Sequence, residues 1–240
     1  MTNVKKRRIP VVTVLLFAIA ISLLLFSSVG GARAVLTYST EANAYTNEIG
    51  MMSTGISLYE NGNPVSGTLL TSFGESDGTV IPGRNYDEEV YVVNSGNATK
   101  GDVDEYVRVI IYTYWMDGDK KAPELDPTFI VPQIIEGDWI KDESACTDER
   151  TVLYYSKLVP AGQPTTPFMS NLMVKEDVLY TVTQSGTGTS STLTNFFYDG
   201  KQICLEIEAD AVQAHHAQDA ILSAWGRSVS IADDGTLSLN

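Results

Sequence analysis

The chain has 240 residues, of which 16 are basic and 30 acidic, giving a formal net charge of −14. Residues 1–34 hold five of the basic residues and no acidic one, which leaves eleven basic against 30 acidic residues, a net charge of −19, in residues 35–240. Such a surface repels nucleic acids and anionic lipids, so nucleic-acid binding is excluded. A hydrophobic content of 43% also excludes a wholly disordered chain.

The first 34 residues have the three parts of an export signal. A basic cluster at residues 5–8 precedes an apolar run at 9–26, and small residues follow up to Ala32-Arg33-Ala34. We therefore predict a signal peptide over residues 1–34, a signal peptidase as a partner during export, and an extracellular or cell-surface location. The alternative is a retained membrane anchor, because the apolar run has the length of a spanning helix. If the segment is a cleaved signal, the protein contacts the membrane only through this segment and only before cleavage.

Residues 35–240 are predicted to form a single domain, because no internal repeat or linker divides them. Short runs of β-branched and aromatic residues alternate with Gly, Pro, Asn and Asp, which favours an all-β sandwich of two antiparallel sheets. Residues 105–115 are the best candidate for a central strand. The other predicted strands are 49–59, 90–94, 129–131, 138–140, 152–157, 168–174, 178–183 and 202–212.

One short C-terminal helix is predicted at residues 211–225, which are rich in alanine and have apolar residues three and four positions apart. Gly226 follows at the position where helices commonly end in glycine. The Ser/Thr/Gly-rich segment 184–194 is predicted to be an exposed loop.

Cys146 and Cys204 are the only cysteines. Outside the cell an even number of cysteines permits one disulfide, but sequence spacing does not place the two residues within bonding distance. A Cys146–Cys204 disulfide and two unpaired thiols therefore both stay open.

No catalytic constellation is recognisable, so the protein is not expected to be an enzyme. The only histidines, His215 and His216, are adjacent, and neighbours on a helix point about 100° apart and do not chelate one ion together. No cofactor is expected. Calcium bound by the acidic turns Asp102/Asp104/Glu105 or Asp117/Asp119 is the alternative to two solvated turns.

Several phrases resemble the TasA/camelysin-like family of exported Gram-positive proteins with a SipW-type signal region. The resemblance is carried by the leader ending Gly-Gly-Ala-Arg-Ala, residues 104–109 leading to Tyr114-Trp115, the Asn94-Ser95-Gly96 turn, residues 142–144 with 149–155, and residues 208–215 through 224–226. The chain departs from better-known members in its two cysteines and its Ser/Thr/Gly-rich segment.

This resemblance implies a jelly-roll-like sandwich that becomes part of the cell surface or biofilm matrix, with other copies or matrix proteins as partners. It also implies fibre formation by strand donation, for which residues 35–45, beginning Val35, Leu36, Thr37, Tyr38, are the matching segment. An exposed sheet edge is a template for such a strand. The alternatives are a segment that pairs within its own domain or stays disordered, a monomeric surface adhesin or binding module, and a camelysin-like metalloprotease.

Overall fold

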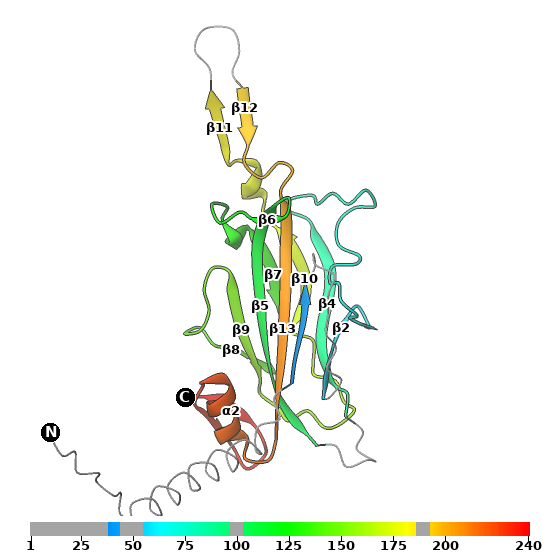
Figure 1. Ribbon diagram of the computed structural model, residues 1–240, viewed down its shortest axis with the longest axis vertical. Helices are drawn as coiled ribbons and strands as arrows, with labels where there is room; N and C mark the ends of the chain where they lie inside the picture. The colour runs from blue at the N-terminus through cyan, green and yellow to red at the C-terminus, as the bar shows by residue number, and fades with distance from the viewer. Residues whose placement is uncertain (1–37, 44–54, 97–102, 186–192) are drawn as a thin grey trace, which may run out of the picture.

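The chain folds mainly into antiparallel β-sheets, as the sequence predicts. The structure, a computed structural model, describes residues 38–43, 55–96, 103–185 and 193–240. Two large sheets face each other across a common core, and a single α-helix of the described residues lies outside them (Figure 1). The predicted all-β sandwich is therefore confirmed for these residues, whereas the signal segment 1–34 lies outside them.

The first large sheet, sheet A, is built around the two longest strands of the described chain. From one edge to the other it contains β1 (Tyr38–Asn43), β13 (Gln202–Gln213), β5 (Glu105–Asp117), β9 (Arg150–Tyr155) and β8 (Trp139–Lys141), and β6 (Lys120–Lys121) pairs with the end of β5.

The second large sheet, sheet B, forms the other layer of the sandwich. Its order is β3 (Asn63–Pro64), β2 (Ile56–Glu60), β4 (Asn85–Asn94), β10 (Met169–Val174) and β7 (Ile130–Ile134). The Asn61-Gly62 turn joins β2 to β3, and both residues have positive φ angles, as a two-residue hairpin turn requires.

Two small hairpins and the helix complete the described structure. One hairpin, β11 (Val182–Ser185) with β12 (Leu193–Phe196), projects away from the sandwich at the top of Figure 1. The other pairs β14 (Val229–Ile231) with β15 (Leu237–Leu239) beside helix α2 (Ala217–Trp225). Short 3₁₀ helices, η2 (Pro127–Phe129) and η3 (Glu176–Leu179), lead into β7 and toward β11.

The β13–β5 ladder runs without a break from Gln202 opposite Met116 to Gln213 opposite Glu105. Along β13, alternate residues from Ile203 to Ala211 belong to the core between the sheets. The residues between them lie on the opposite face, as the two-residue period of a strand requires.

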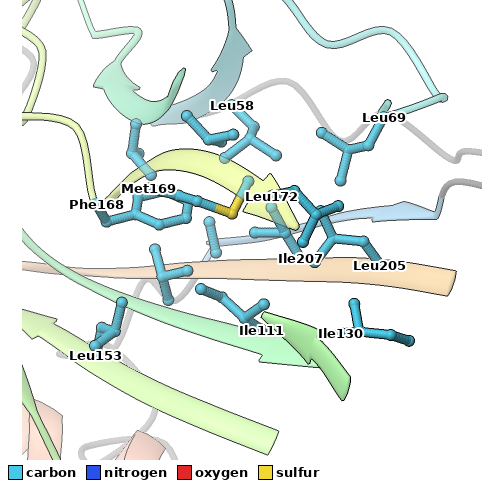
Figure 2. Packing of buried hydrophobic residues seen from close by; sticks show 14 of the residues in the cluster. Leu58, Leu69, Ile111, Ile130, Leu153, Phe168, Met169, Leu172, Leu205 and Ile207 are labelled. Atoms are coloured by element: carbon cyan, nitrogen blue, oxygen red, sulfur yellow. The ribbon is translucent and has the colours of Figure 1, made fainter. Parts of the chain in front are cut away.

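The main core fills the space between sheets A and B. Figure 2 shows side chains from both layers meeting there, with Leu58, Phe168, Met169 and Leu172 from the sheet B side and Ile111 from the sheet A side. Burial of these apolar side chains is the main favourable contribution to folding.

A second apolar cluster lies on the outer face of sheet A. Helix α2 and the β14–β15 hairpin cover this face, where Ile221 of the helix packs with Tyr106, Tyr154 and Val212 of the strands. The sheet is therefore buried on both faces along part of its length.

Several sequence-based boundaries are wrong, among them the start of the strand predicted at residues 90–94, which begins at Asn85 as β4. The helix begins at Ala217 and not at residue 211, because residues 211–213 complete the ladder with β5, although it does end at Gly226 in the left-handed conformation. The predicted strand 178–183 is divided between η3 and β11. The predicted loop 184–194 contributes Gln184 and Ser185 to β11 and its last two residues to β12, while its centre lies outside the described residues.

We expect Leu172→Ala to lower the free energy of unfolding by about 2–5 kcal/mol, because the wholly buried side chain would leave a cavity between the sheets. Leu222→Ala is the matched control, since Leu222 is 54% exposed on α2 and its truncation should cost less than about 0.5 kcal/mol. Urea unfolding followed by tryptophan fluorescence measures both. Equal losses in the two variants would contradict the assigned core.

Candidate functional site

The segment predicted to take part in assembly lies at an edge of sheet A. Tyr38 is the first residue of β1, whereas Val35, Leu36 and Thr37 lie outside the described residues. Six residues of β1 pair antiparallel with β13, from Tyr38 opposite Ala211 to Asn43 opposite Glu206. Within this structure the segment therefore pairs with its own domain, which is one of the two alternatives that the sequence left open.

Strand β1 is attached to the sandwich along only one of its two edges. Sheet A ends at β1, so within the described residues a single ladder, with β13, holds this strand in the sheet. It also lies beside β2 of the other sheet. An edge strand of this kind presents backbone groups for pairing with a further strand.

The receiving strand β13 is held firmly from its other side. Arg108 of β5 forms an ion pair with Asp210, with the guanidinium Nε 3.0 Å from Oδ2, and both side chains are largely buried. The same guanidinium lies 5.1 Å from the ring centroid of Trp225 at the end of α2. This contact joins β5, β13 and α2, so β13 can lose its outer neighbour β1 and still be supported by β5 and the helix.

The two cysteines are free thiols, so the Cys146–Cys204 disulfide is not formed. Cys204 lies on β13 opposite Tyr114, and Cys146 precedes β9, where its sulfur accepts a hydrogen bond from the Val152 N–H at 3.4 Å. Strand β5 lies between β13 and β9, which puts them roughly 10 Å apart. A disulfide requires Cα atoms about 4.4–6.8 Å apart.

The other candidate groups do not come together as a metal site. His215 and His216 are both exposed and precede α2, with their rings 4.1 Å apart. Asp104 accepts a hydrogen bond from the Ala161 N–H, and Asp117 forms an ion pair with Lys201, while Asp102 lies outside the described residues. The described part of the chain contains no group of three or more His, Cys, Asp or Glu residues that could hold a metal ion.

A second surface, which the sequence analysis missed, lies at the base of the projecting β11–β12 hairpin. Of the seven large hydrophobic side chains exposed in the described residues, four lie here: Leu179, Tyr180, Phe196 and Phe197. We call these four residues the arm patch. Residues 179–198 contain no charged residue, and this gap in an acidic sequence is the signal that could have indicated the patch.

Comparisons with protein-family models, with curated proteins and with solved structures find no match to this chain. No helix within the described ranges has the length and apolar character needed to span a bilayer.

We expect the electrophoretic mobility of the unfolded chain to be the same with and without a reductant, because neither cysteine is bonded to the other. In the folded protein Cys204 should react with a thiol reagent at least about tenfold more slowly than Cys146, since burial raises the pKa of the Cys204 thiol and blocks access to it. The Cys146→Ser variant gives the reaction rate of Cys204, and the Cys204→Ser variant gives the rate of Cys146. Equal rates would contradict the assigned burial.

Proposed function

We propose that the chain is a secreted structural protein of the cell surface or biofilm matrix, and that copies assemble when the segment containing β1 pairs with β13 of a neighbour. The observation that carries the proposal is the place of β1: it is the first strand of the described chain, it ends sheet A, and one ladder holds it. The resemblance to the TasA/camelysin-like family, with its jelly-roll-like sandwich, supports the same function.

Exchange of β1 between copies would cost little in direct contacts. A second copy carries the same six residues, so its strand can repeat the register with β13 and restore the same backbone hydrogen bonds. Exchange of an identical element between protomers is a low-cost route to oligomers for this reason. The strand supplies the same contacts whether it belongs to the same chain or to the next one.

The predicted signal peptide supplies a switch for this assembly. The segment 35–45 follows residue 34 directly, so an uncleaved signal keeps the strand tied to the membrane. Cleavage frees it to reach a neighbour. The signal peptidase therefore acts as the partner that starts assembly, and the other partners are further copies or matrix proteins.

Cross-linking through paired cysteines tests the proposal. Glu41 lies opposite Glu208 in the β1–β13 register, so Glu41→Cys with Glu208→Cys should form a disulfide wherever this ladder exists. We expect the form beginning at residue 35 to give covalent oligomers on a non-reducing gel, and the uncleaved chain to give only the cross-linked monomer. Both carry Cys146→Ser and Cys204→Ser to remove the native thiols.

The matched control moves one cysteine out of register. Thr40→Cys with Glu208→Cys should cross-link poorly, because a shift by one residue places a side chain on the other face of the sheet. If the form beginning at residue 35 gives only cross-linked monomer at every concentration, strand donation is wrong and β1 belongs permanently to its own domain.

The arm patch favours a second candidate function, a monomeric surface adhesin or binding module. Exposed aromatic side chains in a segment that contains no charged residue are typical of residues that a partner covers. Tyr180, which lies between η3 and β11, is 75% exposed, and Phe196, the last residue of β12, is 51% exposed. Replacing both with Ser separates the candidates, since strand donation should survive the change whereas attachment through the arm patch should be lost.

A further inference from the structure

Two glutamates are buried together at the end of the β2–β4 ladder. Glu60, the last residue of β2, is 6% exposed, and Glu88 of β4 is wholly buried. Neither carboxyl group forms an ion pair with a basic side chain among the described residues. Buried carboxylates are normally paired with a cation, so this arrangement needs an explanation.

The hydrogen bonds assign different roles to the two carboxyl groups. Both oxygens of Glu60 are acceptors: Oε1 accepts from the Leu70 N–H at 2.5 Å and Oε2 accepts from the Thr71 hydroxyl at 3.0 Å. On Glu88, Oε2 accepts from the Asn61 side-chain amide at 3.2 Å, while the buried Oε1 has no hydrogen-bond partner. If Oε1 of Glu88 carried a proton, it could donate a hydrogen bond to the Glu60 carboxylate.

The surroundings add no positive charge that would allow both groups to ionise. The main-core residues of β13 and β10 are apolar, and the buried polar residues on the same face of β5 are Thr113 and, at the start of the strand, Glu105. Besides Glu60, the titratable neighbours of Glu88 are Asp87 and Glu89, which flank it on β4, and in the loop before β4 Glu75 pairs with Arg84. Burial, and then the charge of Glu60, raise the pKa of Glu88 to about 8.

The contacts of Glu60 fasten a strained segment over the end of sheet B. Leu70 has a φ angle of 61°, a left-handed conformation that is unfavourable for a residue with a Cβ atom. Its N–H is bonded to Glu60, and the adjacent Leu69 is buried in the main core. Weakening the hold of Glu60 would release the segment from this conformation.

We propose that Glu60 and Glu88 share one proton and form a pH-sensitive latch that fastens segment 69–73 to sheet B. While the proton is present, Glu88 donates to Glu60 and every oxygen of the pair has a partner. When it is lost, two negative charges face each other in the core, and the segment loosens from the β2–β4 edge. This latch does not depend on the proposed assembly of the protein.

The donors around the pair suit a shared proton better than a bound cation. Calcium takes six to eight oxygen ligands. Here three N–H or O–H groups, from Asn61, Leu70 and Thr71, point at the carboxylate oxygens. These donors would repel a cation, whereas they stabilise a carboxylate paired with a carboxylic acid.

The latch predicts that stability falls as the pH rises from about 4.5 to 8. Over this range the folded chain holds one more proton than the unfolded chain, so the unfolding equilibrium constant should increase by up to about tenfold per pH unit. Glu88→Gln keeps the shape and the donor toward Glu60 but cannot ionise. We expect urea unfolding of this variant to lack that slope and the variant to be more stable than the wild type at pH 9.

Glu89→Gln is the matched control, because Glu89 is the exposed neighbour on the same strand and its loss should leave the wild-type slope unchanged. A Glu88→Gln variant that keeps the wild-type slope would overturn the latch. So would calcium at millimolar concentration if it stabilised the wild type and not Glu88→Gln, since the pair would then be a cation site. If Glu88→Gln does not fold, carboxyl NMR on the wild type decides, and a Glu88 midpoint near 4.5 would refute the proposal.

Discussion

The unbroken ladder between β5 and β13 is the constraint on which the rest of the structure depends. Its register places one set of alternate residues in the core against sheet B and turns the other set to the outer face, where α2 and the β14–β15 hairpin cover Tyr106, Ile110 and Val212. A slip by one residue would turn core residues of the slipped strand to the outer face. The same strand β13 offers its remaining edge to β1, so the candidate assembly site inherits its geometry from this ladder.

The central strands could be predicted from the sequence because their runs of β-branched and aromatic residues are long. In β5 nine of the ten residues from Tyr106 to Trp115 are β-branched or aromatic, the exception being Arg108. The start of α2 was not predictable in the same way, because Ala211 and its neighbours have helical composition and become strand only through pairing with β5. Tertiary contacts overrode local preference there, as they did where η3 replaces part of a predicted strand.

The candidate sites, too, contain features that local sequence predicts and features that depend on tertiary contacts. The position of segment 35–45 next to the predicted signal follows from chain order, but its partner strand could not be predicted, because β13 lies far away in sequence. Cysteine spacing likewise left the pairing of Cys146 and Cys204 open until the strand order separated them. The burial of Glu88 had a visible signal: it stands between Tyr86 and Val90 at the two-residue period of the core face.

The distance in sequence between the central strands governs how the chain can fold. Arg108 and Asp210, which face each other across β5 and β13, are 102 positions apart. The chain loses the conformational entropy of closing this long loop before the stabilising contacts between the two strands form. The domain therefore belongs among the high-contact-order topologies, which fold slowly. A chain that emerges from its N-terminal end can pair β5 with β9 once residue 155 has appeared, but it lacks β13, and with it the strand that receives β1, until residue 213 has followed.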